Sequence, residues 1–240
     1  REIERRRDEP FDYLTFAGSG EPTLSLDLGE VVSRAKQIVD SPVAVITNST
    51  LLTSPAVRKE VAAADVVLPS LDAVSQEAFM AINRPARGLF AEEMIQGLKD
   101  FRREYSGEIW LEVMLVEGIN DHEAERIARA AEAIDPDRIQ LNTVVRTPAE
   151  PVEPLSQEEM HRMREIFPRA ELIPDWDWSV PKAIKERMLK LLSEKELTLQ
   201  EIGLHLDLAG NDAIKYCKIL EKDGSISRKL YQGNLYFHAN

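Results

Sequence analysis

The sequence predicts an α/β fold in which strands and helices alternate, followed by a smaller unit of different character. Five times between residues 12 and 142, a short apolar run is followed by a loop and then by apolar residues at helical spacing. This alternation is typical of parallel strands joined by right-handed crossovers. Polar residues cluster where each run ends, which indicates one functional face of an open or closed barrel.

Charge marks the change of character near residue 182. Residues 182–240 hold ten Lys/Arg and eight Asp/Glu, whereas residues 1–181 hold twenty and thirty-four. The net charge of -12 over 240 residues argues against binding nucleic acid through the whole surface. No apolar run approaches the ~20 residues of a membrane span and no signal peptide opens the chain. We therefore expect a cytoplasmic protein without a membrane partner.

The expected elements of the first part are short strands and amphipathic helices. The strands cover residues 12–16, 43–46, 65–72, 109–116 and 138–142, and the helices cover 28–39, 55–63, 91–105, 122–134 and 155–166. The apolar run 43–46 is continuous rather than alternating, which suits a strand covered on both faces. We interpret residues 175–181, which contain two tryptophans, as a linker or lid.

The second part predicts three helices and a hairpin. Thr198-Leu199-Gln200-Glu201 is a capping box that opens the second helix. The third helix ends at Asp223-Gly224, and residues 225–231 and 235–237 form the two strands of the hairpin. This order of elements resembles a winged helix.

Cysteine usage limits the chemistry of the chain. Cys217 is the only cysteine, so neither a disulfide nor a multi-cysteine metal or cluster site can form from this chain alone. The four histidines are scattered and show no metal-ligand spacing. We expect Cys217 to be a small buried core residue.

The glycine-rich stretch after the first strand is the strongest candidate for a binding site. Residues 13–17 form a β-prone run that ends in Gly18-Ser19-Gly20-Glu21-Pro22. Glycine allows a sharp turn and a close approach to a ligand, and proline stiffens the exit from the loop. A carboxylate on a rigid loop at the C-terminal end of a strand lies where α/β folds place binding groups.

Several further motifs follow in order and resemble those of the radical S-adenosylmethionine (radical SAM) superfamily. After Phe16-Ala17-Gly18-Ser19-Gly20-Glu21-Pro22 these are Ile46-Thr47-Asn48-Ser49, Pro69-Ser70-Leu71-Asp72-Ala73, Ile82-Asn83-Arg84-Pro85, Val116-Glu117-Gly118-Ile119-Asn120-Asp121 and Gln140-Leu141-Asn142-Thr143. None is specific alone, and together they span about residues 10–150. The chain looks closest to uncharacterised members with a C-terminal winged-helix-like extension.

The resemblance implies a fold and a domain plan. It implies a partial (β/α)6 TIM-like barrel lacking its first strand over residues 1–174, a linker at 175–181 and a winged-helix-like domain at 182–240. It also implies two cofactors, S-adenosylmethionine and a [4Fe–4S] cluster. Together these would generate a 5′-deoxyadenosyl radical that acts on an unknown substrate.

The same resemblance assigns cofactor-binding residues at the strand ends. Gly18, Ser19, Gly20 and Glu21 would receive the methionine amino group, since an ammonium fits backbone carbonyls and a fixed carboxylate. Ser70 and Asp72 would lie near the ribose hydroxyls, and Gly118-Ile119-Asn120 near the adenine. Asn48 and Asn142 would bind S-adenosylmethionine or substrate. The resemblance leaves the catalytic residues unknown and assigns no metal ligand to this chain.

One part of the family pattern is missing, namely the CxxxCxxC loop that ligates the cluster. Either it lies upstream of Arg1 or the chain is a degenerate relative, and we expect the first. Residues 12–16 should then be an edge strand, paired only with residues 43–46. Three functions remain open: a radical SAM enzyme served by an electron donor, a nucleic-acid-binding regulator, and a cluster-less scaffold. The substrate, RNA or protein among others, is unknown.

Overall fold

The computed structural model describes residues 2–6, 11–18, 20–144, 152–173, 180–208, 210–231 and 234–240. The chain divides into two compact units, residues 1–174 and residues 175–240. Each unit has a hydrophobic core of its own.

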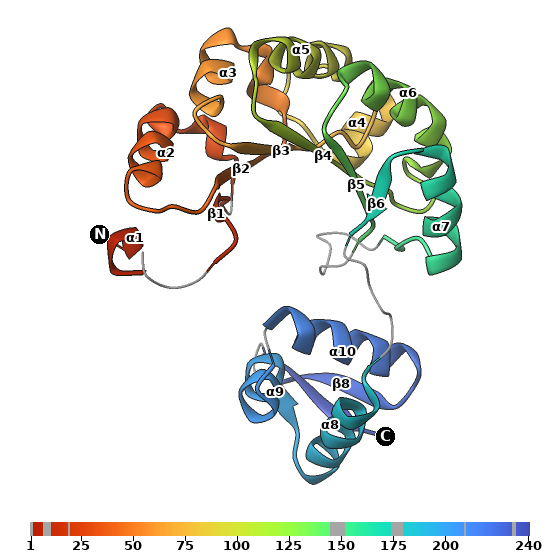
Figure 1. The fold of residues 1–240 in the computed structure, drawn as a ribbon. Coiled ribbons are helices and arrows are strands. Elements are labelled where there is room, and N and C mark those ends of the chain that lie inside the picture. Colours follow the sequence, from red (N-terminus) through yellow and green to blue (C-terminus); the bar gives the residue numbers. More distant parts are fainter. Residues whose placement is uncertain are drawn as a thin grey trace. The chain divides into compact units, whose positions relative to one another are not determined.

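The first unit is built on a six-stranded parallel sheet whose strands lie side by side in chain order (Figure 1). The strands are β1 (Leu14–Phe16), β2 (Val43–Thr47), β3 (Val66–Pro69), β4 (Glu108–Met114), β5 (Arg138–Asn142) and β6 (Ala170–Leu172). A curved parallel sheet of this kind confirms the predicted α/β class and its partial TIM-like architecture.

The helix α1 (Glu2–Arg6) precedes β1, and the other helices connect successive strands, as parallel pairing requires. The connecting helices are α2 (Leu28–Lys36), α3 (Pro55–Val61), α4 (Gln76–Ile82), α5 (Ala91–Glu104), α6 (Ala124–Ile134) and α7 (Gln157–Ile166). Short 3-10 turns are η1 (Pro22–Leu24), η2 (Thr50–Thr53) and η3 (Asp121–Glu123). Figure 1 shows α2, α3, α5, α6 and α7 along the outer side of the curved sheet.

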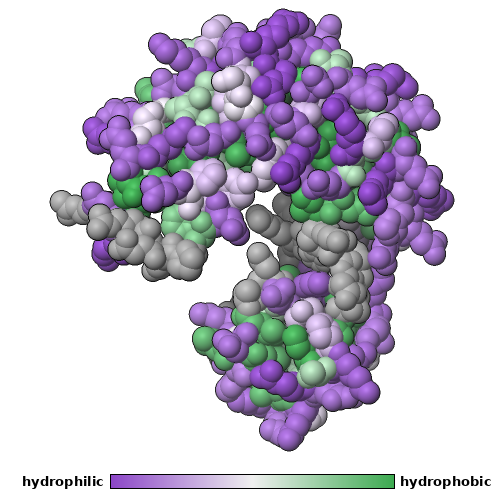
Figure 2. Space-filling view, in the orientation of Figure 1, coloured by the Kyte–Doolittle hydropathy of each residue, from purple (hydrophilic) through white to green (hydrophobic). Residues whose placement is uncertain are grey.

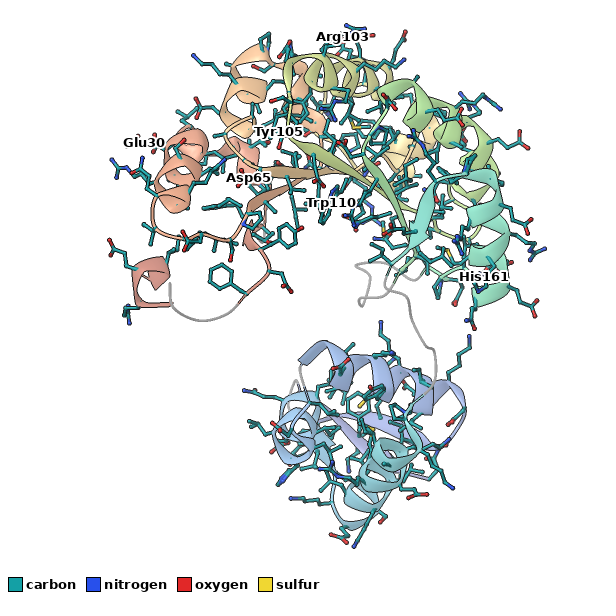
Figure 3. The ribbon with its side chains drawn as sticks, viewed as in Figure 1. Glu30, Asp65, Arg103, Tyr105, Trp110 and His161 are labelled. Atoms are coloured by element: carbon teal, nitrogen blue, oxygen red, sulfur yellow. The ribbon has the colours of Figure 1, made fainter. Side chains whose placement is uncertain are left out.

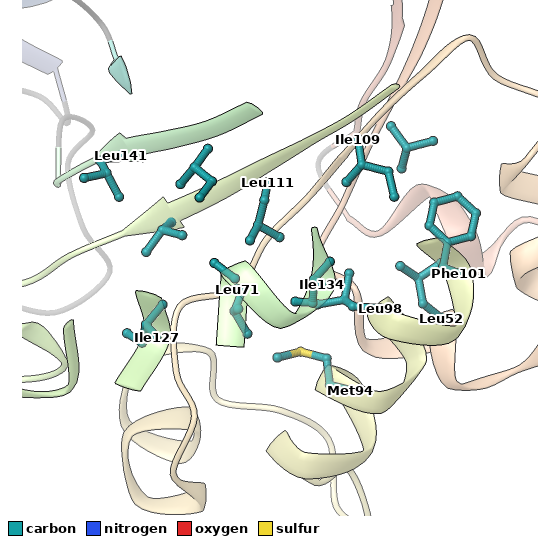
Figure 4. Packing of buried hydrophobic residues seen from close by; sticks show 14 of the residues in the cluster. Leu52, Leu71, Met94, Leu98, Phe101, Ile109, Leu111, Ile127, Ile134 and Leu141 are labelled. Atoms are coloured by element: carbon teal, nitrogen blue, oxygen red, sulfur yellow. The ribbon is translucent and has the colours of Figure 1, made fainter. Parts of the chain in front are cut away.

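The core lies between the sheet and these helices. In β4 the side chains of Ile109, Leu111 and Val113 are fully buried and belong to the cluster that also contains Leu98 and Phe101 of α5. Figure 4 shows this packing. Successive side chains of a strand alternate between its two faces. The remaining residues of β4 therefore lie on the opposite, inner face of the sheet.

The inner face is partly exposed and carries both polar and apolar side chains. Trp110, Glu112 and Met114 alternate with the buried residues of β4, and each keeps part of its surface accessible. Figure 3 shows Trp110 on the side of the sheet away from α5, the helix that carries Arg103. The outer surface over the helices is mostly hydrophilic in Figure 2, as expected for solvated helix faces.

The first strand occupies one edge of the sheet, as predicted. Among the described residues β1 pairs only with β2, with Leu14 opposite Val43 and Phe16 opposite Val45. The strand is shorter than the predicted 12–16.

Two elements of the first unit were missed by the sequence analysis. The strand β6 pairs with β5 beyond the five predicted strands, and its Ala-Glu-Leu sequence contains no β-branched residue to signal a strand. The helix α4 spans seven residues and is capped by Ser75, whose side chain accepts a hydrogen bond from the backbone N–H of Ala78.

The second unit contains the predicted three helices and hairpin, plus a short additional strand. These are α8 (Lys182–Glu194), β7 (Leu197–Thr198), α9 (Leu199–Leu206), α10 (Gly210–Lys222), β8 (Ile226–Tyr231) and β9 (Asn234–Ala239). The strands form an antiparallel sheet in the order β7-β9-β8. The capping box of Thr198 and Glu201 is present, and Cys217 is buried. No described helix in either unit is long and apolar enough to cross a membrane.

Candidate functional site

The Glu21 carboxylate is fixed between the loop after β1 and the end of β2. Its Oε1 atom accepts hydrogen bonds from the Thr23 backbone N–H (3.1 Å), the Thr23 hydroxyl (2.6 Å) and the Thr47 hydroxyl (2.6 Å). Its Oε2 atom accepts one from the Asn48 backbone N–H (2.7 Å). Each oxygen of a carboxylate offers about two acceptor sites. Oε1 is therefore fully used, whereas Oε2 holds a single described donor and can take one more.

The glycines before Glu21 leave open space beside it. A Cβ atom added to Gly20 would meet no protein atom within 4 Å, and one added to Gly18 would make only ordinary contacts. Neither glycine has a positive φ, so backbone strain does not explain them. Ser19 lies outside the described residues. The glycines keep the backbone accessible next to the carboxylate.

The end of β2 is tied to the end of β3. Ser49 is fully buried in a left-handed conformation (φ 69°), and its hydroxyl donates to the Ser70 carbonyl (2.7 Å). The side chain of Asn48 is exposed at the rim, where its Oδ1 atom accepts hydrogen bonds from the Thr50 backbone and hydroxyl. Of the predicted residues Asn48 and Ser70, only Asn48 therefore presents an exposed side chain.

Asp72 is buried below the rim and both of its oxygens are occupied. Oδ1 accepts from the Met114 backbone N–H (2.9 Å) and Oδ2 from the Asn83 side-chain amide (2.8 Å). Burial and, to a smaller extent, the nearby Glu112 carboxylate raise the pKa of Asp72 to about 6, against the two hydrogen bonds, which lower it. Asp72 therefore joins β3, β4 and the end of α4, and it titrates above the range of an ordinary carboxyl.

Asn120 is fully buried and makes hydrogen bonds with both ends of its amide. Its Oδ1 atom accepts from the Val116 backbone N–H, and its Nδ2 atom donates to the carbonyls of Asp72 and Met114, each at 2.7 Å. The side chain therefore holds the loop after β4 against the loop after β3. Only the neighbouring backbone, where Gly118 has a φ of +69°, remains for a ligand.

Asn142 lies at the end of β5 and is oriented by a residue of β4. Its Nδ2 atom donates to Oε1 of Glu112. A carboxylate can only accept, so this bond fixes which end of the Asn142 amide is the donor. The Oδ1 atom of Asn142 is buried and has no hydrogen-bond partner among the described residues.

A cavity of about 400 Å³ lies beside α4, next to the Gly118–Ile119 backbone. Its wall includes Glu123, which is buried and accepts hydrogen bonds from the backbone N–H groups of Val74 and Ser75. Burial alone would raise the pKa of Glu123, but those bonds and the Arg126 guanidinium together lower it. Glu123 is thus a buried carboxylate whose hydrogen bonds join the loop after β4 to the loop after β3.

Replacing Glu112 with glutamine is expected to lower the pKa of Asp72 below about 6, because one like charge is removed. A titration of the Asp72 carboxyl by ¹³C NMR measures this shift. The matched control is Glu132→Gln, the same change at an exposed position of α6. An unchanged Asp72 pKa in the Glu112 variant would show that the two carboxylates are not coupled.

The raised pKa of Asp72 also determines the direction in which its contribution to the free energy of unfolding changes with pH. The folded state holds the proton more tightly than the unfolded chain, whose ordinary value is 3.8. The contribution of neutral Asp72 to the free energy of unfolding is therefore complete below that value and is lost as pH rises toward about 6.

Sequence reasoning missed several residues that build this edge of the sheet. Thr47 and Ser49 lie inside a quoted motif, but nothing in the sequence shows that their hydroxyls join neighbouring strands. Glu112 does carry a signal, since it is the one acid within the otherwise apolar run 109–116. No group of three or more His, Cys, Asp or Glu side chains that could hold a metal ion occurs in the described ranges.

The parallel sheet with its glycine–glutamate loop matches a known superfamily. The family model of the radical SAM superfamily covers residues 1–131, and the chain belongs to that superfamily. Solved structures show the same fold at low identity. A domain of a pyruvate-formate lyase-activating enzyme from Bacteroides vulgatus matches with a TM-score of 0.54 and 20% identity, over 66% of this chain and 97% of that one. A radical SAM methyltransferase from Sphaerobacter thermophilus gives 0.51 and 20%, over 71% and 53%.

Curated relatives match over different shares of their length. A protein named GTPase Obg from Brachyspira hyodysenteriae is 35% identical over 95% of this chain, which spans 35% of that protein. A UPF0026 protein of Methanocaldococcus jannaschii is 36% identical over 62% of the chain and 46% of its own length. A UPF0026 protein of Helicobacter pylori is 27% identical over 96% and 76%. The chain thus spans less than half of the first two relatives.

Proposed function

We propose that this chain is the S-adenosylmethionine-binding part of a radical SAM enzyme. The observation that carries the proposal is the Glu21 carboxylate, which is held rigidly at the end of β1 and retains one acceptor site on Oε2. An ammonium group needs such a fixed charge, and charge-assisted hydrogen bonds are the stronger ones. The open backbone at Gly20 gives a ligand room to approach it.

The other proposed contacts follow the edge of the sheet. Asn48 offers an exposed side chain beside Glu21. Ser70 follows β3, and the Gly118–Ile119 backbone follows β4. Asp72 and Asn120 act through the loops that they hold, because their side-chain atoms are already bonded within the protein. The chain's own residues thus bind and orient the ligand.

The described residues do not fit the cluster. Three thiolates are needed, and Cys217 is the sole cysteine of the sequence. Burial raises the pKa of its thiol to about 12, and the neighbouring Glu221 adds to the effect. We propose that the cluster ligands come from outside the printed sequence. When bound, a [4Fe–4S] cluster and S-adenosylmethionine supply one-electron reductive cleavage of the sulfonium. The electron donor and the substrate are not identified.

Reconstitution with iron and sulfide tests this proposal. The 240-residue chain should retain no cluster. The complete gene product should show the broad visible absorption of an iron–sulfur cluster and should bind S-adenosylmethionine. The Cys217→Ser variant is the control, because it removes the buried thiol and should change neither result. A complete gene product that takes up no cluster would contradict the enzyme and favour a cluster-less scaffold.

No contact among the described residues of the second unit favours nucleic-acid binding over the enzyme. Three of its cations, Lys185, Arg228 and Lys229, are paired with acidic residues of the same unit. Such pairs reduce the positive charge available to phosphates.

A further inference from the structure

The pairing between β3 and β4 is interrupted in the middle of the six-stranded sheet. Their continuous pairing ends at Val67 and Ile109, and the two strands meet again at an isolated bridge between Ser70 and Glu112. The other neighbouring strands of the described sheet pair without such a break. The backbone therefore joins β1–β3 to β4–β6 less completely than it joins the strands within each half.

Pro69 accounts for this interruption. The N–H of Ser70 donates to the Thr47 carbonyl of β2, and the N–H of Leu71 donates to the Glu112 carbonyl of β4. Because the backbone groups of a strand point alternately to its two neighbours, the nitrogen of Pro69 faces β4. A proline has no N–H to donate to a ladder. One backbone bond between β3 and β4 is therefore missing at this level of the sheet.

The side chain of Trp110 spans the same junction on the inner face of the sheet (Figure 3). Trp110 precedes Glu112 by two residues, so it lies at the level of the missing bond. Its ring centroid is 5.4 Å from that of Tyr13, with the rings at 73°. Tyr13 directly precedes β1, and three strand spacings, about 14 Å, separate β1 from β4. The rings meet because the sheet is curved and both side chains lean across β2 and β3.

Trp110 is also held from the other half of the sheet. Its indole N–H donates to Oε2 of Glu108, two residues earlier in β4 (2.7 Å). Arg138 of β5 lies in register with Trp110, and its guanidinium carbon is 4.5 Å from the ring centroid. A cation over an aromatic face is attracted to it and restrains the ring. The indole is therefore fixed to β4 and β5, and through it Tyr13 is placed relative to both strands.

Small side chains lie where the two rings cross the sheet. Ala44 of β2 and Val66 of β3 are in register with each other and with Glu108, and all three alternate with residues of the core cluster. Ala44 and Val66 are nevertheless only 3% and 4% exposed. The hydrogen bond to Glu108 draws the Trp110 indole toward their level. The rings of Tyr13 and Trp110 thus account for the burial of two inner-face residues outside that cluster.

The proposed ligand contacts lie on both sides of the β3–β4 junction. Glu21 is tied to the end of β2 by the Thr47 hydroxyl and the Asn48 backbone N–H. The Gly118–Ile119 backbone and Asn142 lie at the ends of β4 and β5 instead. A ligand that contacts both groups requires a fixed separation between them. That separation depends on how sharply the sheet curves between β3 and β4.

We propose that Tyr13, Trp110 and Arg138 form a brace that sets the curvature of the sheet, with Trp110 as the positioning residue. Asp72 and Asn120 join the same two halves at the carboxyl ends of the strands. The brace joins them nearer the amino ends, where the backbone ladder is broken. The effect on S-adenosylmethionine rests on the proposed function, whereas the brace itself does not.

Pulsed electron paramagnetic resonance measures this curvature in the 240-residue chain without S-adenosylmethionine. Spin labels are placed at Ser33→Cys in α2 and Ala133→Cys in α6, two exposed helix positions on opposite sides of the junction. Cys217→Ser removes the native thiol. We expect one narrow distance distribution in this parent, and a broader distribution displaced by a few ångströms in Trp110→Ala.

Further variants separate the brace from a general loss of structure. Trp110→Phe keeps an aromatic ring and should stay close to the parent distribution. Tyr13→Ala should reproduce the effect of Trp110→Ala, and the double variant should add nothing, because both remove one contact. Phe90→Ala, at an exposed aromatic position before α5, should leave the distribution unchanged. If Trp110→Ala loses the circular dichroism of the fold, Tyr13→Ala decides. Parent-like distances in Tyr13→Ala would overturn the brace.

Affinity for S-adenosylmethionine tests the positioning role in the complete gene product. If the sheet has the required curvature about one tenth of the time in Trp110→Ala, affinity falls by about tenfold. Trp110→Phe should bind almost as tightly as the wild type. Altered distances with unchanged affinity would refute the positioning role. A wild-type complete gene product that binds no S-adenosylmethionine would contradict the proposed function and leave the distance measurement unaffected.

Discussion

Replacing Glu21 with alanine is expected to weaken the binding of S-adenosylmethionine by about 10- to 100-fold, because one charge-assisted hydrogen bond to the methionine ammonium is lost. The same change removes the acceptor for Thr23, Thr47 and the Asn48 backbone. The free energy of unfolding should therefore fall by about 2 kcal/mol. Calorimetric titration of the reconstituted complete gene product measures the affinity, and urea unfolding measures the stability.

The variant Thr47→Val separates these two effects. It has nearly the same shape and leaves the carboxylate in place, and it removes the hydroxyl that donates to Glu21 and accepts from the Ser49 backbone N–H. Stability should fall by about 1 kcal/mol, with affinity for S-adenosylmethionine almost unchanged. If Glu21→Ala instead loses stability but binds as well as the wild type, Glu21 serves only to join the two loops.

Asn120→Ala is expected to lower the free energy of unfolding by about 3–5 kcal/mol. The substitution leaves the Val116 N–H and the carbonyls of Asp72 and Met114 without a partner in a fully buried place. An unsatisfied buried group costs far more than a bond exposed to water, because water cannot replace the lost partner. Urea unfolding followed by circular dichroism gives the value.

The same substitution at Asn48 provides the comparison. The Asn48 side chain is exposed, and among the described residues it bonds only within its own turn, to Thr50. Asn48→Ala should therefore cost less than about 1 kcal/mol. If both variants lost the same free energy of unfolding, the burial of Asn120 would not explain its contribution to stability.

The sequence predicts the strands that have an unambiguous pattern and misses those that depend on neighbours. Residues 43–46 form a continuous apolar run, and β2 is indeed an interior, largely buried strand between β1 and β3. By contrast, β6 has three residues, and only its pairing with β5 makes it a strand. Propensity is weak over so short a segment, and tertiary context decides it.

For the site, the sequence predicts positions better than roles. Asn48, Ser70 and Asn142 lie at or directly after strand ends, and Glu21 and Asn120 lie in the loops that follow β1 and β4, as expected from their motifs. The sequence does not show that the Asn120 amide is fully used within the protein, because its partners are backbone groups up to 48 residues away. The link between Asn142 and Glu112 likewise depends on register between two strands.

The order of strands in the first unit bears on how a ribosome-bound chain acquires its structure. Each strand from β2 to β5 pairs with the strand just before it and the strand just after it in the chain. Every pairing therefore closes a connection of one crossover, and no strand must wait for a distant segment to be synthesised. A nascent chain can add one strand and helix at a time as they emerge, with each new strand binding to the edge left by the last.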